Sequence, residues 1–298
     1  MSESKLKYSM LAIDLDGTLL CSRGQISKPN REAIADARRQ GLLVTICTGR
    51  GLIECKHLTD QIEQADPVVV AGGSMIACPL TRRTLHRFPM NHDLVRRLVN
   101  VLASHGHAVL VLKDPEHAGH DYVVVSATGE AGVDPVTRWW FAKMNVPVRY
   151  VASLDEDEHL PHTVRVGVCG PKRRTDGVAL IVRDSFANQV MMQHFHAVVP
   201  RPEDDDPEGK TLILECFDRA ANKWSAIEWL AGSRGLPATG VAAIGNDIND
   251  VAMLQQAALA VAMGNAIDEA KAVAHRHTLG NDEDGVAHAI EQILQGRW

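Results

Sequence analysis

The sequence predicts an α/β protein whose parallel-sheet core is interrupted by an inserted second domain. Short apolar runs such as residues 8–13 are typical of strands buried on both faces of a parallel sheet, and polar clusters follow them directly. The α/β pattern stops near residue 82 and resumes after a Pro- and Asp-rich segment. We therefore expect a core formed by residues 1–82 and 207–298, with residues 83–206 as the inserted domain.

The first half of the core shows strand and helix signals in alternation. The apolar run at 8–13 is followed by a helix signal from Ser27 to Gly41, with a capping Ser, a Pro in the first turn and a Gly just past the end. Two further apolar strands are predicted at 42–47 and 68–70. This order predicts parallel strands with functional groups at their carboxyl ends.

The middle of the chain mixes strand-like and helical pieces. Residues 122–125 and 163–168 are typical of strands, and residues 94–102 are typical of a helix, so this part is expected to be α+β. The segment 200–207 has the composition of a loop or hinge. An inserted α+β domain therefore precedes the return of the core pattern.

The second half of the core repeats the α/β pattern. Asn222 is expected to cap a helix that begins at Lys223, and residues 241–244 and 259–263 are expected to form buried strands. Together with the first half, these elements complete a single parallel sheet.

Composition excludes several classes of partner. Of 298 residues, 45% are hydrophobic and 23% are charged, and the net charge is −6 with Lys and Arg dispersed, so we expect no nucleic-acid partner. No apolar run is long enough to span a membrane, the start of the chain is polar, and the six cysteines form no Cys-x-x-Cys pattern. We expect a cytoplasmic protein, and the sequence leaves its oligomeric state open.

The stretch Asp14-Leu15-Asp16-Gly17-Thr18 follows the first strand. Residues two apart on a strand point to the same side, so Asp14 and Asp16 are expected to face one crevice. Two carboxylates this close favour either a shared proton or a bound cation. Gly17 allows a sharp turn, and Thr18 adds a hydroxyl that a small anionic ligand could contact.

Three more polar clusters lie at expected strand or helix ends. Thr48-Gly49-Arg50 combines a hydroxyl with exposed backbone N–H groups, and Lys223 begins a helix, so both suit a phosphoryl group. The stretch Gly245 to Asp250 supplies carboxylates and amides, whose hard oxygens favour Mg²⁺ over Zn²⁺. Each cluster alone is compatible with an ordinary turn or helix cap. Their combination indicates a phosphate and metal site.

The four clusters together resemble the haloacid dehalogenase-like phosphohydrolase superfamily, in its Cof-type branch. Residues 14–20 match the first motif, residues 48–50 the second, Lys223 the third and residues 245–254 the fourth. The resemblance implies a Rossmann-like parallel-sheet core with an inserted α+β cap domain of the C2 type. It also implies a phosphatase that requires Mg²⁺ as cofactor.

The resemblance further implies roles for individual residues. Asp14 would attack phosphorus and Asp16 would act as general acid and then general base. The implied phosphate-binding residues are Thr48, Gly49, Lys223 and Asn249. The implied metal-binding residues are Asp14, Asp16 through its backbone carbonyl, Asn246 and Asp250.

The chain departs from the family pattern in the fourth motif, where Asn246 replaces the usual Asp. An Asn oxygen can still bind Mg²⁺, and Asp247 is an alternative ligand. The leading function is Mg²⁺-dependent hydrolysis of a small phosphorylated metabolite, such as a sugar phosphate or a phosphorylated cofactor. The alternatives are a sugar phosphomutase on the same core and a non-catalytic protein that binds phosphorylated metabolites.

Overall fold

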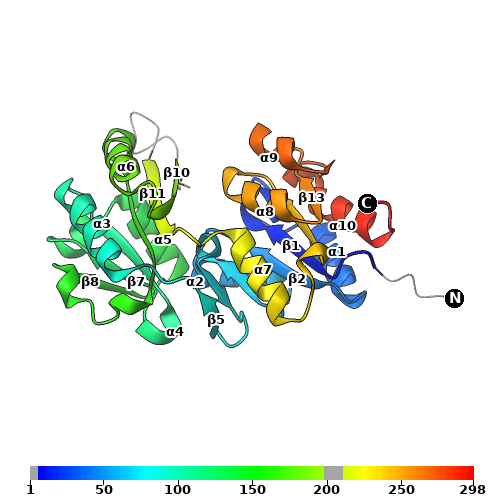
Figure 1. Cartoon of the computed structure of the whole chain (residues 1–298), viewed down its shortest axis with the longest axis horizontal. Coiled ribbons are helices and arrows are strands. Elements are labelled where there is room, and N and C mark those ends of the chain that lie inside the picture. Colours follow the sequence, from blue (N-terminus) through cyan, green and yellow to red (C-terminus); the bar gives the residue numbers. More distant parts are fainter. Residues whose placement is uncertain (1–5, 198–210) are drawn as a thin grey trace. The chain divides into compact units, whose positions relative to one another are not determined.

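The computed structural model describes residues 6–197 and 211–298, which form two compact units (Figure 1). The first unit ends at His86 and resumes at Asn222, and the second extends from Arg87 to Ala221. Each unit has its own sheet. The segment 200–207, for which the composition predicts a hinge, lies outside the described residues.

The first unit contains an eight-stranded sheet in the order β14-β13-β12-β1-β2-β3-β4-β5. Neighbouring strands from β14 to β3 are parallel, whereas β4 is antiparallel to β3. The strands are β1 (Met10–Asp14), β2 (Leu43–Cys47), β3 (Val68–Val70), β4 (Met75–Ala77), β5 (Thr84–Arg87), β12 (Val241–Gly245), β13 (Leu259–Ala262) and β14 (Arg276–His277). The predicted parallel-sheet core is thereby confirmed.

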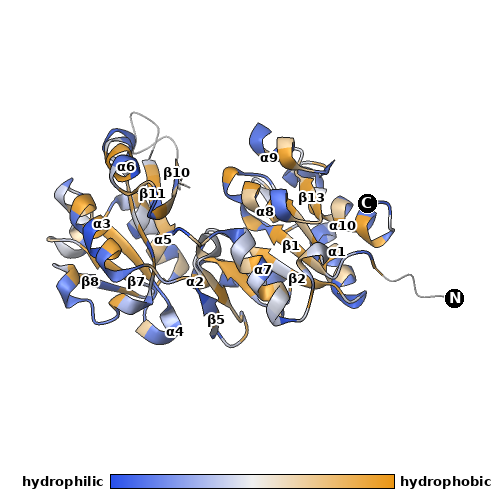
Figure 2. Ribbon diagram, viewed as in Figure 1, coloured by the Kyte–Doolittle hydropathy of each residue, from blue (hydrophilic) through white to orange (hydrophobic). Residues whose placement is uncertain are grey.

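Two helices of the first unit, α1 and α7, begin at the capping residues that the sequence predicts. Ser27 accepts a hydrogen bond from the Asn30 N–H at 3.3 Å, and Asn222 accepts one from the Ser225 N–H at 3.0 Å, as the predicted caps require. The helices are α1 (Lys28–Arg39), α2 (Leu52–Gln61), α7 (Lys223–Ser233), α8 (Val251–Gln256), α9 (Asp268–Val273) and α10 (Gly285–Leu294). The apolar strands of this sheet stand out in Figure 2, because their side chains form the buried core.

The second unit contains a six-stranded sheet in the order β10-β11-β9-β6-β7-β8. All neighbouring pairs are antiparallel except β7 and β8, so the predicted α+β character is confirmed. The strands are β6 (Val109–Lys113), β7 (Tyr122–Val125), β8 (Val148–Val151), β9 (Thr163–Pro171), β10 (Val190–His196) and β11 (Thr211–Asp218). The helices are α3 (His92–Ser104), α4 (Pro115–Ala118), α5 (Pro135–Met144) and α6 (Lys172–Phe186).

The strand β11 lies in the second sheet, although the sequence pattern places residues 207–298 in the core. It pairs with β9 and β10, and the division between the units falls after Ala221. The difference arises because an apolar strand is recognisable from its residues, whereas the sheet that it joins depends on its partners. The first unit therefore resumes at Asn222, which caps α7.

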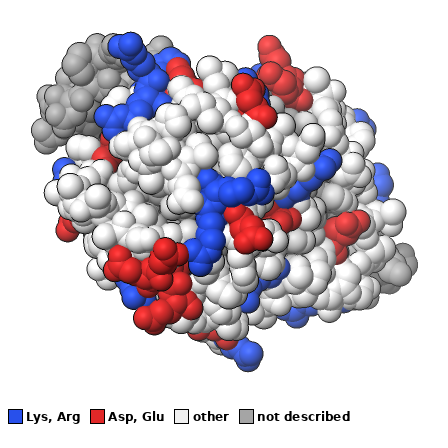
Figure 3. Space-filling model, turned by 60° about the vertical axis from the view of Figure 1, so that its left-hand side comes forward, with Lys and Arg blue, Asp and Glu red and all other residues white. Residues whose placement is uncertain are grey.

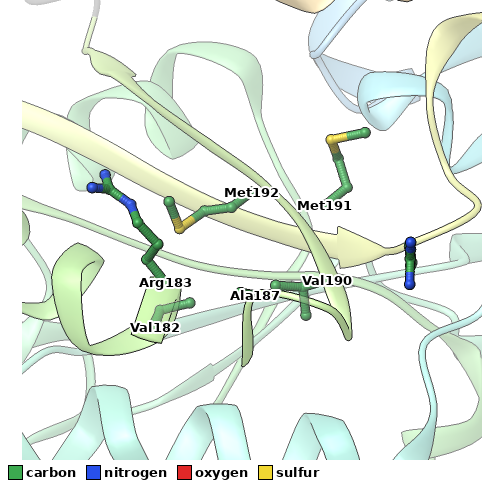
Figure 4. A pocket seen from close by; sticks show the side chains of 7 residues that line it. Val182, Arg183, Ala187, Val190, Met191 and Met192 are labelled. Atoms are coloured by element: carbon green, nitrogen blue, oxygen red, sulfur yellow. The ribbon is translucent and has the colours of Figure 1, made fainter. Parts of the chain in front are cut away.

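The surface of the chain shows mixed charge and one apolar hollow among its features. On the face shown in Figure 3, small groups of Lys and Arg alternate with Asp and Glu. In Figure 4, an apolar hollow of about 360 Å³ opens between α6 and the β10 edge of the second unit, lined by Val182, Met191 and Met192 among others. None of the predicted site residues lines this hollow. Among the described residues, no helix has the length and apolar character needed to cross a membrane.

Candidate active site

The register of the first sheet brings three of the predicted clusters to one edge. Asp14 is the last residue of β1 and pairs with Cys47 of β2, so Thr48 follows at the same level. On the other side of β1, Ile13 pairs with Ile244 of β12, and Asn246 begins the loop that follows. The carboxyl ends of three adjacent strands therefore gather these polar residues, as the sequence predicts.

Lys223 joins two of the clusters through its ammonium group. Its Nζ donates to Asp14 Oδ1 at 2.6 Å and to Asp250 Oδ1 at 2.7 Å, and lies 3.4 Å from Asn249 Oδ1. The side chains of Lys223 and Asp250 are fully buried, and that of Asp14 is 5% exposed. A buried lysine held by two carboxylates is a structured charge network rather than a solvated side chain at a helix start.

Burial and charge shift the titration of this network. Burial, and after it the neighbouring Asp250, raise the pKa of Asp14 to about 7 against the opposing effect of Lys223. Burial would lower the pKa of Lys223, but Asp14 and Asp250 together hold that pKa above its usual value. One lysine cannot neutralise two buried carboxylates. A second cation beside Asp14 would therefore keep it ionised at neutral pH.

Asp16 has a different partner. Its side chain is half exposed and receives two hydrogen bonds from Arg50, from Nε to Oδ2 at 3.0 Å and from Nη2 to Oδ1 at 2.6 Å. Asp16 lies in a tight turn, Leu15–Leu19, in which Gly17 has φ +76°. Asp14 and Asp16 thus each have their own basic partner. The sequence pattern predicts no role for Arg50, although its place in Thr48-Gly49-Arg50 after a core strand is a signal for one.

The loop after β12 is fixed by Asp250. Asp250 Oδ2 accepts from the N–H groups of Asn246 at 2.9 Å and Asp247 at 3.1 Å, while Oδ1 accepts from Lys223. Asp247 is exposed and accepts from the N–H of Ile248 at 2.7 Å. Asn246, rather than Asp247, extends towards Asp14.

The amide of Asn246 suits the role of a magnesium ligand. Its Oδ1 accepts from Thr18 Oγ1 at 2.9 Å, and the same amide position lies 3.0 Å from Asp14 Oδ2 and 3.0 Å from the Asp16 carbonyl oxygen. Mg²⁺ binds octahedrally at roughly 2.0–2.1 Å, which separates adjacent ligand oxygens by about 2.9 Å. The spacing and the hard oxygen donors therefore fit this ion.

Thr48 and Gly49 lie beside this group. Thr48 is fully buried, and its Oγ1 accepts from the Arg50 N–H at 3.1 Å. A Cβ added to Gly49 would meet no atom within 4 Å, so the backbone there borders open space. An anion can approach backbone N–H groups in such a position.

A further group of possible metal ligands lies in the second unit, where no sequence motif predicts one. Side-chain atoms of Asp114, His117 and His162 lie within 4.8 Å of one another. The guanidinium of Arg87 donates to Asp114 Oδ2 and lies 3.2 Å from His117 Nδ1. Because Arg87 already supplies a positive charge here, we assign no metal to this group.

The fold and the strand-end residues together define a hydrolase with an α/β core and an inserted domain. The sequence model of the haloacid dehalogenase-like hydrolase family matches residues 11–150 and 206–290, and the chain belongs to this family. It is 28% identical to 5-amino-6-(5-phospho-D-ribitylamino)uracil phosphatase YwtE of Bacillus subtilis, over 97% of this chain and 99% of that protein.

Solved structures support the same assignment of fold. A haloacid dehalogenase-like hydrolase from Bacteroides thetaiotaomicron has a TM-score of 0.76 and 24% identity, over 96% of this chain and 99% of that one. The subclass IIB sugar phosphatase BT4131 has a TM-score of 0.73 and 19% identity, over 95% and 98%. The predicted family, fold class and enzyme class are thereby confirmed.

Proposed function

We propose that this protein is a Mg²⁺-dependent phosphomonoesterase that acts on a small phosphorylated metabolite through an aspartyl-phosphate on Asp14. The observation that carries the proposal is the buried arrangement of Asp14, Lys223 and Asp250 at the carboxyl edge of the sheet. Asp16 lies two residues from the nucleophile and is half exposed, so it can contact both a leaving group and water.

The first chemical step uses Asp14 and Asp16. Asp14 Oδ1 attacks phosphorus, the ester P–O bond breaks, and Asp16 gives a proton to the departing alkoxide. Asp16 then takes a proton from a water molecule that attacks phosphorus, which breaks the bond to Asp14 and releases phosphate. Since Arg50 occupies both oxygens of Asp16, this cycle requires Asp16 to leave Arg50.

The remaining residues stabilise charge and fix geometry. Lys223, adjacent to Asp14 Oδ1, would offset the charge of the phosphoryl oxygens, with Thr48, Gly49 and Asn249 as further contacts. Mg²⁺, when bound, would neutralise part of the phosphoryl charge.

Asp14, the Asp16 carbonyl and Asn246 are the residues suited to hold the ion. Both oxygens of Asp250 are engaged by Lys223 and by backbone N–H groups. Asp250, which the family resemblance implies as a metal ligand, is therefore proposed to position the loop and Lys223.

The proposed substrate class is taken from the compounds for which two similar proteins are named. YwtE is named for a phosphoribitylamino compound and BT4131 for sugar phosphates, so a sugar phosphate or a phosphorylated cofactor precursor is proposed here. A panel of such compounds, including 5-amino-6-(5-phospho-D-ribitylamino)uracil, is assayed for phosphate release with Mg²⁺ and with EDTA.

The wild type is expected to release phosphate from at least one compound in the presence of Mg²⁺. Asp14→Asn is expected to release none. Isomerised sugar phosphate without phosphate release would instead identify a mutase. Binding of the panel compounds without turnover would identify a non-catalytic protein.

A further inference from the structure

The side chain of Asn246 ends among three oxygen atoms. Its inward amide position is 2.9 Å from Thr18 Oγ1, 3.0 Å from Asp14 Oδ2 and 3.0 Å from the Asp16 carbonyl oxygen. Its outward amide atom lies against Gly17, where an added Cβ would come within 2.6 Å of it. The absence of a side chain at Gly17 therefore leaves room for this amide to sit beside the nucleophile.

The amide has two orientations of nearly identical shape, and they suit opposite states of the site. With the oxygen inward, Oδ1 faces Asp14 Oδ2 and the Asp16 carbonyl, which is favourable only when a cation lies among them. With the nitrogen inward, Nδ2 donates to Asp14 Oδ2, the Asp16 carbonyl and Thr18 Oγ1. Thr18 suits both orientations, because its hydroxyl either donates to the oxygen or accepts from the nitrogen.

An aspartate in this position could not make the second arrangement. An ionised carboxylate only accepts hydrogen bonds, so it would face the two oxygens without a donor and would add charge beside Asp14 and Asp250. The buried network contains a single lysine for these two carboxylates. Replacing the usual Asp by Asn thus removes a repulsion that only a bound cation would otherwise relieve.

We propose that, in the metal-free protein, Asn246 completes this site with its own amide hydrogen bonds, and that it admits Mg²⁺ by turning the amide oxygen inward. The inference rests on the proposed function, because it takes Mg²⁺ as the ion. Its consequence is a site that is stable without metal and binds Mg²⁺ less tightly than a carboxylate site would.

The test compares metal-free stability and Mg²⁺ affinity, neither of which requires turnover. Melting temperatures in EDTA and in Mg²⁺, with calorimetric Mg²⁺ titrations, are measured for the full-length wild type, Asn246→Asp, Asn246→Ala and Gln255→Glu. Gln255→Glu makes the same amide-to-carboxylate change at an exposed position of α8 and serves as the matched control.

In EDTA, Asn246→Asp and Asn246→Ala are expected to melt at least about 3 °C below the wild type, and Gln255→Glu close to it. Asn246→Asp is expected to bind Mg²⁺ about tenfold more tightly, whereas Asn246→Ala is expected to bind it more weakly. Equal melting in EDTA and equal Mg²⁺ affinity for wild type and Asn246→Asp would overturn the inference alone. Absence of Mg²⁺ binding in every variant would overturn the proposed magnesium dependence and the inference with it.

Discussion

Replacing Lys223 by Met tests the charge network most sharply, because Met has a similar length and no charge. The change leaves Asp14 and Asp250 buried without the ammonium that contacts them at 2.6 and 2.7 Å. Removing one partner of a buried ion pair costs about 3–5 kcal/mol, which corresponds to a fall in Tm of about 10 °C at pH 8. Activity is expected to be lost as well, because Lys223 contacts the nucleophile.

The destabilisation is expected to grow with pH. The pKa of Asp14 is about 7 in the folded protein, against 3.8 in an unperturbed carboxyl, and Lys223 lowers it. A carboxyl whose folded pKa is raised binds more protons when folded, so stability falls as pH rises between the unfolded and folded pKa values. Removing Lys223 raises the folded pKa of Asp14 and so extends this pH range upward. The loss of stability in Lys223→Met should therefore be smaller at pH 5 than at pH 8.

Thermal and urea unfolding in EDTA at pH 5 and pH 8 measure this difference. Lys28→Met is the matched control, because Lys28 forms an exposed pair with Glu32 at 3.6 Å that should contribute less than about 1 kcal/mol. The reasoning is refuted if Lys223→Met is no less stable than Lys28→Met at pH 8. It is also refuted if the loss is the same at both pH values, since packing alone would then explain it.

The remaining predictions concern Asp16 and its partner Arg50. Asp16→Asn should reduce kcat/KM for alkyl phosphates about 10²–10⁴-fold but lower kcat/KM for activated aryl phosphates much less, because an aryl leaving group needs no proton; equal losses in kcat/KM would argue against the acid role. Arg50→Lys should free Asp16, since lysine cannot form the paired hydrogen bonds, and should change KM or kcat. Unchanged kinetics would show that the Arg50 contact has no part in the cycle.

The positions of the strands and caps could be predicted from the sequence, because local signals specify them. The run at 8–13 corresponds to β1, and Ser27 and Asn222 cap α1 and α7 as expected. Apolar runs and capping residues act within a few positions of the chain. The sheet to which Thr211–Asp218 belongs could not be predicted, because its pairing with β9 and β10 is a long-range contact.

The site residues could be named from the sequence, but their contacts could not. Asp14 and Lys223 are 209 positions apart and meet only because α7 begins beside the end of β1. The pairing of Arg50 with Asp16 depends on the tight turn after β1. Likewise, a pattern cannot distinguish Asn246 from its neighbour Asp247, because the turn after β12 decides which side chain points inward.

The buried contacts of Lys113 in the second unit could not be predicted from the sequence either. Polar residues follow it directly in the sequence from Asp114 onward. Its side chain is nevertheless fully buried with that of Asp157, to which it donates, and it also donates to Thr163 Oγ1 at 2.7 Å. A lysine next to polar residues is normally exposed. Its burial depends on a partner 44 positions away, which no local signal reveals.

The central claim is that Asp14 carries the phosphoryl group during turnover. Its most direct test is acid quenching of the enzyme during turnover of a substrate found in the panel, followed by peptide mass spectrometry. We expect one added phosphoryl group on the peptide that contains Asp14, and no added phosphoryl group on the same peptide of Asp14→Asn. A phosphoryl group on another residue, or full turnover by Asp14→Asn, would contradict it.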